Sequence, residues 1–234
     1  MVRKRIAIIP ARGGSKRIPK KNIIEFCDKP MIAWTIEAAL KSNLFDRILI
    51  STDDPETADV ARKWGGEAPF LRESHFDDHS TVSEATLSAI IQAGRYWGEE
   101  YDTVVQLMAN CPLRGASEIV HALSQFDRHN RQFQLSCFKY GWMNPWWAVH
   151  LDTQGHPQAL FAEAFGKRSQ DLPELFCPSG AIWIADTKSF LQAGTFYGPG
   201  HCFEPMNWRA AVDIDDWDDL VFANAILRLS EQYS

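Results

Sequence analysis

Short apolar runs alternate with amphipathic segments along the first half of the chain. Compact apolar runs predict strands over residues 5–10, 47–51 and 102–108. Apolar residues that recur every three or four positions predict helices over residues 30–42, 55–64, 81–97 and 116–126. Strands and helices in alternation indicate parallel strands joined by helical crossovers. The expected fold class is therefore α/β and Rossmann-like, with a mainly parallel sheet flanked by helices.

The second half of the chain breaks this alternation. After an expected strand, the residues as far as about 178 are irregular and rich in Trp, Pro and Gly. We interpret residues 139–178 as a small insertion that projects from the main sheet. The remaining elements are strands over 134–139, 181–185 and 210–213 and a closing amphipathic helix over 217–232. One domain, 1–234, is expected to hold them all.

Charge is distributed unevenly along the chain. The formal net charge of −6 argues against a protein adapted to bind nucleic acid. Basic residues concentrate near the N-terminus, at positions 3–5, 12, 16–17 and 20–21. Acidic residues concentrate near the C-terminus, at positions 213, 215–216 and 218–219. One end of the chain is thus suited to anions and the other to a cation.

Apolar runs and metal-ligand residue types narrow the class of protein further. No apolar run is long enough to span a bilayer, and no signal-peptide core follows the basic N-terminus. Five cysteines without a CxxC pair argue against a disulfide framework and a zinc site. His75 and His79 lie near Asp77 and Asp78, but no helical pattern gives them a shared face for a metal. A cytoplasmic protein without a membrane partner is expected.

The loop after the first predicted strand has the features of an anion site. It begins at Ala11, where ligands of parallel α/β sheets bind, and carries Gly13 and Gly14 between basic residues. Adjacent glycines can adopt backbone conformations closed to other residues and bring N–H groups close to a phosphate. Arg12 and Lys21 can bind the phosphate oxygens. GxxxxGK[ST] and GxGxxG are both absent, and a solvated basic loop is the alternative.

Two aspartates near the C-terminus are the candidate metal ligands. Asp213 and Asp215 are two apart at the end of a predicted strand, so both side chains are expected on one face. Paired carboxylates suit Mg²⁺ (or Mn²⁺), which also bridges to substrate phosphates. The alternative is capping of the last helix, and we assign that role to Asp216, Asp218 and Asp219.

Six segments together resemble the acylneuraminate cytidylyltransferase family, which covers CMP-sialate, CMP-pseudaminate and CMP-legionaminate synthetases. They are 8–22 (IIPARGGSKRIPKKN), 29–32 (KPMI), 51–54 (STDD), 112–114 (PLR), 168–173 (RSQDLP) and 212–215 (VDID). The resemblance spans almost the whole chain. It implies an enzyme that transfers CMP from CTP to the anomeric hydroxyl of a nine-carbon acidic sugar, a nonulosonate, and releases pyrophosphate. It also implies a homodimer formed through the insertion.

The resemblance, with the chemistry above, gives each candidate residue a role. The nucleotide-binding residues would be Ala11, Arg12, Gly13, Gly14, Ser15, Lys21, Asn22, Arg72, Ser80 and Ser83. The catalytic residues would be Arg12, Lys21 and Asp215, and the metal ligands Asp213 and Asp215. The sugar-binding residues would be Gln106, Met108 and Arg168. In this scheme the cations stabilise the leaving pyrophosphate, and Asp215 helps to remove the proton of the sugar hydroxyl.

The segment 107–114 departs from the sialate synthetases. Those enzymes usually carry Gln-Pro-Thr-Ser-Pro-Leu-Arg there, and without a gap Met108 replaces the Gln that touches the sugar. Gln106 can serve only if the register shifts. A methionine cannot make those hydrogen bonds, which disfavours N-acetylneuraminate as the substrate. The segment 168–173 looks more like the pseudaminate enzymes.

Several residues have a second interpretation. Arg72 fits an ordinary surface arginine, and Arg168 fits a salt bridge between subunits. The Trp-rich stretch 142–147 fits a dimer interface or a small local core equally well. Asp54 is expected to cap the helix that begins at Pro55, whereas Asp53 has no assigned role.

Two other functions fit parts of the sequence. One is a cytidylyltransferase for the eight-carbon sugar Kdo, although its loop lacks the Gly-Gly-Ser-Lys form found at residues 13–16. The other is a non-catalytic nucleotide or sugar sensor on the same fold. The presence of Arg12, Lys21, Asp213 and Asp215 counts against a sensor.

Overall fold

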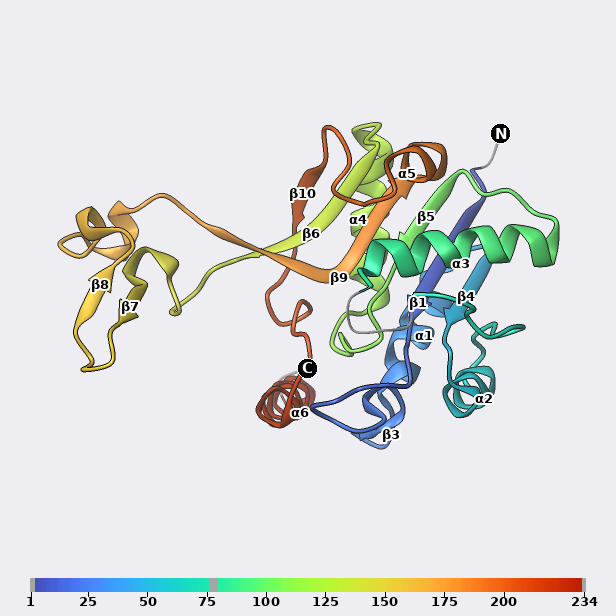
Figure 1. Cartoon of the computed structure of the whole chain (residues 1–234), viewed down its shortest axis with the longest axis horizontal. Coiled ribbons are helices and arrows are strands. Elements are labelled where there is room, and N and C mark those ends of the chain that lie inside the picture. The colour runs from blue at the N-terminus through green and yellow to red at the C-terminus, as the bar shows by residue number, and fades with distance from the viewer. Residues whose placement is uncertain (1–2, 76–79, 233–234) are drawn as a thin grey trace.

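A six-stranded sheet forms the centre of the molecule, in a computed structural model that describes residues 3–75 and 80–232 (Figure 1). The strand order is β10-β6-β9-β5-β1-β4. The strands are β1 Arg5–Pro10, β4 Arg47–Ser51, β5 Thr103–Gln106, β6 Phe133–Lys139, β9 Phe176–Asp186 and β10 Cys202–Pro205. Only β9 runs antiparallel to its neighbours within this sheet. The predicted α/β class with a mainly parallel sheet is confirmed.

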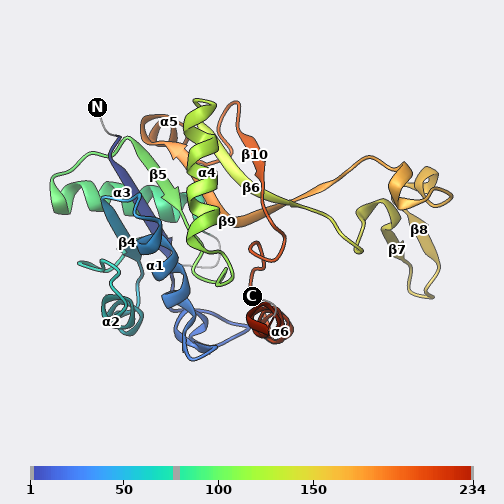
Figure 2. The same ribbon diagram turned by 180° about the vertical axis from the view of Figure 1, so that it is seen from behind.

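Helices cover both faces of the sheet. They are α1 Met31–Ser42, α2 Pro55–Lys63, α3 Val82–Trp97, α4 Ala116–Arg128, α5 Thr187–Ala193 and α6 Trp217–Gln232. On one face, Ala7 and Ile9 of β1 pack in a cluster with α1, α2 and α4 (Figure 2). On the other face, Ile6 and Ile8 pack in a cluster with α3 and α5. The alternation along β1 thus follows the two-residue period of a strand buried on both faces.

The predicted strand over 210–213 is wrong, and the strand β10 was not predicted. Trp208 to Ala211 form a turn, in which the Ala211 N–H donates to the Trp208 carbonyl at 3.1 Å. The apolar pattern there reflects burial of Ala210, Ala211 and Ile214 without sheet pairing. The strand β10 lies at the sheet edge and ends at Pro205, where a missing N–H costs no ladder bond.

A narrow arm projects from one end of the sheet, carried by β6 and β9 (Figures 1 and 2). Its tip holds a hairpin of β7 Val149–Leu151 and β8 Pro157–Ala159, with short 3-10 turns at 145–147, 162–164 and 169–171. Trp146 packs edge-on against Phe161 at 5.0 Å between ring centroids, and Trp147 Nε1 donates to the Ala164 carbonyl. The side chain of Trp142, by contrast, is 86% exposed. The arm lies within the range 139–178.

A third cluster of buried residues joins the two ends of the chain. It contains Ile18 from the loop after β1, Ile214 from the segment before α6, and Ala223 of α6. The short antiparallel strands β2 Glu25–Phe26 and β3 Lys29–Pro30 complete it through Phe26. Burial of each large apolar side chain stabilises such a cluster by about 1.5–3 kcal/mol. Loop 11–22 and segment 212–216 are therefore held against each other.

No helix in the described ranges 3–75 and 80–232 is both long and apolar enough to cross a membrane.

Candidate active site

A cleft of about 440 Å³ opens where β1, β4 and β5 end. It is lined by Pro10, Arg12, Ser15, Lys16, Arg17, Ile18, Lys21, Asn22, Arg72, His75, Ser80, Thr81, Val82, Ala85, Met108, Asn110 and Asp215. Five of these side chains are Lys or Arg, and one is a carboxylate. A site so rich in cations suits a polyanion such as a nucleoside triphosphate. Arg12 and Asp215, from opposite ends of the chain, face the same cleft.

The structure gathers most, but not all, of the predicted residues at this cleft. Those that line it are Arg12, Ser15, Lys21, Asn22, Arg72, Ser80, Met108 and Asp215. The glycines Gly13 and Gly14 belong to the same loop without lining the cleft. Ala11 is buried beneath the loop, where its N–H donates to the Ser51 carbonyl at 2.9 Å. Asp213 faces a neighbouring pocket.

The glycine loop is built differently from the expected cradle. Neither Gly13 nor Gly14 has a positive φ, so the expected special backbone conformations are absent from this pair. The Gly13 N–H donates to the Asp53 carboxylate at 3.0 Å, and the Ser15 N–H donates to the Gly13 carbonyl. These two amides are therefore engaged within the protein. The side chains of Arg12 and Lys21 are left as the main candidates for binding phosphate.

Gly13 and Gly14 are expected to respond differently to alanine. A Cβ at Gly13 would lie 2.7 Å from the Cβ of Asp54, whereas a Cβ at Gly14 meets nothing within 4 Å. Overpacking of this kind costs about 1–3 kcal/mol. We expect Gly13→Ala to lower the thermal unfolding temperature and weaken CTP binding, and Gly14→Ala to leave both nearly unchanged. Equal behaviour of the two variants in thermal unfolding and CTP titration would contradict the crowding at Gly13.

Asp53, which the sequence left unassigned, ties the loop to Arg72. Its Oδ1 accepts from Gly13 and lies 3.8 Å from Arg72 NH2. Arg72 is only 6% exposed, so it is no ordinary surface arginine. Burial lowers the pKa of Arg72, Asp53 opposes the shift, and the nearby charge of Arg12 adds to it. Two guanidinium groups thus converge on the cleft near one carboxylate.

The adjacent Asp54 has the predicted capping role. It precedes α2 and accepts from the Thr57 N–H at 2.9 Å. Asp216 and Asp219 likewise accept backbone N–H groups at the start of α6, as expected for helix caps. Asp213 and Asp215 make no such caps, which separates the candidate metal pair from its acidic neighbours.

Asp215 lies between the cleft's cations. Lys21 Nζ donates to its Oδ1 at 2.7 Å, and Arg17 NH2 contacts its Oδ2 at 2.7 Å. Burial would raise the pKa of Asp215, but the bonds to Lys21 and Arg17 outweigh it, so the pKa is lowered. Asp215 is therefore ionised at neutral pH. Arg17, which follows Lys16 in the basic loop, was not among the predicted site residues.

Asp213 has the opposite electrostatic setting. Partial burial, followed by repulsion from Asp215, raises the pKa of its carboxyl to about 6. Lys21 and Arg17 lower this pKa, while Asp219 raises it further. Solvent still reaches the Asp213 side chain and screens part of this repulsion. Among the residues that the structure describes, no Lys or Arg forms an ion pair with Asp213.

The raised pKa of Asp213 predicts a pH-dependent stability difference. An aspartate carboxyl has a pKa of about 3.9 in an unfolded chain. Between that pH and about 6, the folded protein therefore binds one proton that the unfolded chain does not. The free energy of unfolding therefore decreases as the pH rises through this window. We expect the unfolding temperature of Asp213→Asn, relative to the unchanged protein, to increase from about pH 4.5 to about pH 8 in metal-free buffer. A difference independent of pH would contradict the raised pKa.

The donor set at the pair fits Mg²⁺ or Mn²⁺. Oδ1 of Asp213 and Oδ1 of Asp215 both accept from one nitrogen, Asn110 Nδ2, so the two oxygens lie close together. No group of three or more His, Cys, Asp or Glu side chains converges within residues 3–75 and 80–232. Two carboxylates are what Mg²⁺ uses when substrate phosphates and water supply its other ligands. The two side chains are brought together by an irregular segment, without the predicted strand.

A second pocket, of about 590 Å³, adjoins the cleft on the far side of the aspartates. It is lined by Phe138–Met143, Cys177–Gly180, Trp208, Ala211–Asp213, Asp219 and Phe222. Trp208 and Phe222 stack with their ring planes 22° apart. Asp213 lines this aromatic pocket and Asp215 lines the cleft, so the pair stands at the boundary between the two. In the sequence, the Trp-rich stretch 142–147 pointed to this pocket only through Trp142, which lines it.

Two of the predicted sugar-binding residues lie away from both pockets. Gln106 is fully buried in β5, and its Nε2 contacts the Gly180 carbonyl at 3.4 Å. Arg168 lies on the arm, largely exposed, and makes both of its side-chain hydrogen bonds to Asp171. Met108 alone of the three lines the cleft. Gln106 lines neither pocket.

Ser83 and the histidine pair also fall outside the cleft lining. Ser83 is buried on α3, where its hydroxyl accepts the Phe196 N–H at 3.2 Å. Its neighbours Ser80 and Thr81 line the cleft instead. His75 lines the cleft too, but the remaining members of the weak histidine–aspartate metal candidate, residues 77–79, lie outside the described residues.

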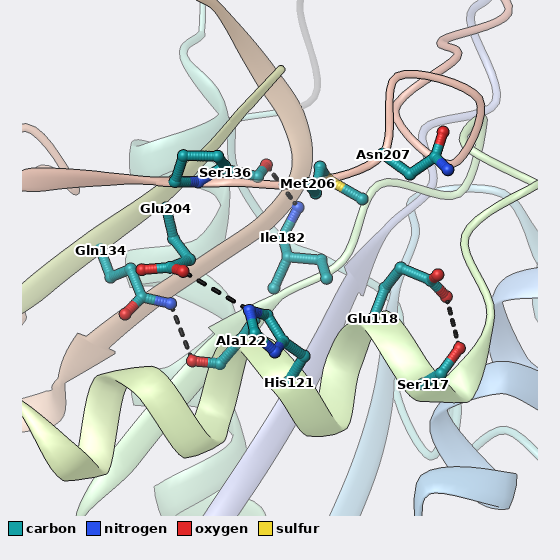
Figure 3. Close-up of a pocket in the computed structure, with 11 residues that line it drawn as sticks. Ser117, Glu118, His121, Ala122, Gln134, Ser136, Ile182, Glu204, Met206 and Asn207 are labelled. Atoms are coloured by element: carbon teal, nitrogen blue, oxygen red, sulfur yellow. Dashed lines mark hydrogen bonds and ion pairs between the residues drawn. The ribbon is translucent and has the colours of Figure 1, made fainter. Parts of the chain in front are cut away.

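Another hollow, of about 410 Å³, lies between α4 and β10 and contains none of the predicted site residues (Figure 3). His121 and Glu204 face each other there, with 3.5 Å between His121 Nε2 and Glu204 Oε1. Glu118 accepts from Ser117 at the start of α4, away from that pair. Glu204 is already paired with Arg131. This hollow holds no cluster of cations comparable to the cleft.

Comparisons with known proteins agree with this site. Residues 6–140 match the family model described as cytidylyltransferase. The chain is 33% identical to a pseudaminic acid cytidylyltransferase of Campylobacter jejuni, over 98% of each chain. It is 30% identical to a CMP-N,N'-diacetyllegionaminic acid synthase of Legionella pneumophila, over 97% of each.

Solved structures show the same fold at lower identity. A CMP-2-keto-3-deoxy-manno-octonic acid synthetase in complex with CTP matches with a TM-score of 0.70 and 16% identity, over 97% of this chain and 99% of its own. At this identity the match supports the fold alone. The sequence relatives carry the assignment and agree with the resemblance seen in the motifs. The chain therefore belongs to the cytidylyltransferase family, in its nonulosonate-activating branch, and is a nucleotidyltransferase.

Proposed function

We propose that this enzyme transfers CMP from CTP to the anomeric hydroxyl of a nonulosonate at a Mg²⁺ site formed by Asp213 and Asp215, with release of pyrophosphate. One observation carries the proposal: a cation-rich cleft and an aromatic pocket meet at the two aspartates. A nucleotide and an acceptor bound on the two sides would have their reacting atoms at this boundary. Such positioning contributes a large part of catalysis in phosphoryl-type transfer.

The cleft is assigned to CTP. All five residues of this assignment line the cleft: Arg12 and Lys21 would bind the phosphate oxygens, and Arg72, Ser80 and Thr81 would bind the pyrimidine ring or its ribose. Val82 and Ala85 provide an apolar wall for the base. The positive side chains would stabilise the charge that develops on the leaving pyrophosphate. A bound Mg²⁺ would supply further charge neutralisation on the phosphates.

The aromatic pocket is assigned to the acceptor sugar. The anomeric oxygen of the acceptor forms a bond to the α-phosphorus of CTP, and the bond from that phosphorus to the bridging oxygen of pyrophosphate breaks. The hydroxyl proton passes to the aspartate pair, of which Asp213 faces the acceptor pocket. Met108, on the cleft side, offers no hydrogen bond to a sugar hydroxyl.

Pseudaminic acid is the acceptor that we propose first. It carries two acetamido groups and a terminal methyl, where N-acetylneuraminic acid carries one acetamido group and a glycerol chain of hydroxyls. Aromatic side chains at Tyr140, Trp142, Trp208 and Phe222 suit those apolar groups better than they suit the hydroxyls. The relative named for pseudaminic acid, and the segment 168–173, point the same way.

A homodimer in the cytoplasm is part of the same proposal. The arm exposes Leu151, Leu160 and Phe165, which are apolar side chains that a second subunit could cover. Arg168 also lies on the arm, paired with Asp171 and outside the lining of both pockets, and a dimer would offer it a site on the second subunit. CTP is a cytoplasmic nucleotide, which supports a cytoplasmic location.

A panel of acceptors tests the proposal. Pyrophosphate release from CTP is measured with Mg²⁺ and, separately, pseudaminic acid, legionaminic acid, N-acetylneuraminic acid and Kdo. We expect release with pseudaminic acid, the highest kcat/KM among the four, and no release after chelation of the metal. Release only with Kdo would contradict the acceptor class. Binding of CTP without release for any acceptor would favour the non-catalytic sensor.

A further inference from the structure

We propose that Asn110 is a positioning residue of the metal site: its side-chain amide holds the carboxylates of Asp213 and Asp215 together so that one cation can bind both. The inference rests on the magnesium-dependent transfer proposed above. Asn110 was not singled out in the sequence, where it lay within the segment that departs from the sialate synthetases. In that ungapped comparison it stands where those enzymes have Thr.

Asn110 makes direct contact with both carboxylates. Its Nδ2 donates a short hydrogen bond to Asp213 Oδ1 and lies 3.4 Å from Asp215 Oδ1. The same nitrogen donates to the backbone carbonyl of Ile214 at 3.1 Å. The backbone carbonyl of Asn110 in turn accepts from the Ile214 N–H at 2.9 Å. The loop after β5 is thereby joined to the segment before α6. The carboxylates, more than 100 residues further along the chain, take their positions from this contact.

A neutral donor is the group that such a place requires. Two adjacent carboxylates repel each other, and a lysine between them would neutralise the charge that a metal needs. An amide N–H₂ offers two hydrogens, which the two carboxylates and the Ile214 carbonyl share, and it adds no net charge. The opposite orientation of the amide would aim its oxygen at two carboxylates, which repulsion disfavours. Asn110 is 4% exposed, so little water is available to replace it.

The cations of the cleft do not perform this task. Lys21 and Arg17 both contact Asp215, and within residues 3–75 and 80–232 neither Lys nor Arg forms an ion pair with Asp213. Asn110 is the side chain that contacts both members of the pair. Residues that orient metal ligands typically contribute about 10–100-fold to metal affinity or activity. A loss of that size is expected when the amide is removed.

The test compares Asn110→Ala, Asn110→Thr and a control, Asn224→Ala. Asn224 donates its amide to the Leu220 carbonyl on α6 and contacts neither aspartate, so it controls for the loss of a partly buried asparagine amide. Two measurements are made: the Mg²⁺ concentration that half-saturates pyrophosphate release at saturating CTP, and Mn²⁺ binding to the protein alone by electron paramagnetic resonance. Thermal unfolding is recorded for each variant.

In Asn110→Ala we expect both metal constants to rise about 10–100-fold, with the KM for CTP at saturating Mg²⁺ changed less than about threefold. Asn110→Thr keeps one donor and is expected to lie between Ala and Asn, which a purely structural role would not produce. Asn224→Ala should leave the metal constants unchanged. The Thr variant decides the matter if the Ala variant does not fold.

Two results would overturn the role of Asn110. In the first, both Asn110 variants keep metal constants within about twofold of the unchanged protein, with or without a lower unfolding temperature. Asn110 would then contribute only to packing. Metal-independent turnover and no Mn²⁺ binding by the unchanged protein would instead remove the proposed metal requirement, and the positioning role with it. The first result leaves the proposed transfer reaction intact, so the two failures are distinguishable.

Discussion

Replacement of Asp215 by asparagine is expected to lower kcat by about 100-fold or more while the protein remains folded. Asp215 lines the cleft, accepts from Lys21 at 2.7 Å and contacts Arg17 at 2.7 Å. The asparagine has the same shape but no charge. It would weaken the metal site and leave both cations without the carboxylate that orders them. Steady-state pyrophosphate release and thermal unfolding measure the two effects.

Asp218→Asn is the matched control for this experiment. Asp218 is exposed in the first turn of α6, three residues from Asp215, and lines neither pocket. Its loss removes the same charge from the same acidic segment. We expect its kcat to stay within about twofold of the unchanged protein, since exposed charges at a helix start contribute only about 0.3–1 kcal/mol. Near-normal turnover in Asp215→Asn would remove Asp215 from the reaction.

Replacement of Arg12 by alanine is expected to lower kcat/KM for CTP by about 100-fold or more. Arg12 lines the cleft and lies close enough to Arg72 to lower the pKa of that guanidinium further. Asp53 lies 3.8 Å from Arg72 NH2. The Lys and Arg side chains that line the cleft suit the phosphates of CTP. Arg12→Lys should recover only part of the loss, because Lys lacks the planar two-point contact.

Lys20→Ala controls for the loss of a cation from the same loop. Lys20 pairs with Glu56 on α2 and does not line the cleft. Its replacement is expected to leave kcat/KM for CTP within about twofold, because exposed ion pairs contribute about 0–1 kcal/mol. A similar loss in Arg12→Ala and Lys20→Ala would mean that the overall charge of the loop matters and that Arg12 makes no specific contact.

The sequence predicted the sheet best where burial alone decides the pattern. Residues 5–10 and 47–51 are buried on both faces of the sheet, and their apolar runs predicted β1 and β4 with the observed bounds. The exposed edge strand and the turn near the C-terminus were less readable, whereas β4 is an edge strand that is buried. The four-residue β10 is half exposed, and the apolar residues 210–211 are buried in a turn. Apolar periodicity indicates which residues are buried. At residues 202–205 a paired strand is half exposed, and at residues 210–211 buried residues pair with no strand.

The candidate site was also predicted from the sequence in part. The placement of Arg12, Lys21, Arg72 and Asp215 at one cleft was predicted from the basic loop, the acidic segment and the family motifs. The role of Asp53 was not readable, because its partner Gly13 is 40 residues away along the chain. Such contacts depend on tertiary packing and leave no local periodicity.

In the glycine loop, the sequence motif identified a site residue correctly, but the physical reason for its glycine differs from the expected one. Gly13 was expected to supply unusual backbone angles for binding phosphate. In the structure its φ is ordinary, its N–H is bonded to Asp53, and the close approach of Asp54 is what excludes a side chain. Sequence alone distinguishes poorly between a glycine needed for its φ and one needed for space.

The most direct test of the account is a crystal structure with CTP, Mg²⁺ and a non-reacting analogue of pseudaminic acid. We predict phosphates bound to Arg12 and Lys21, and a metal ion ligated by Asp213 and Asp215. We also predict the sugar among Tyr140, Trp142 and Trp208, with its anomeric position facing the α-phosphate. Phosphates bound outside this cleft would contradict the proposal. A sugar whose anomeric oxygen is blocked by the aspartates from reaching the α-phosphorus would contradict it as well.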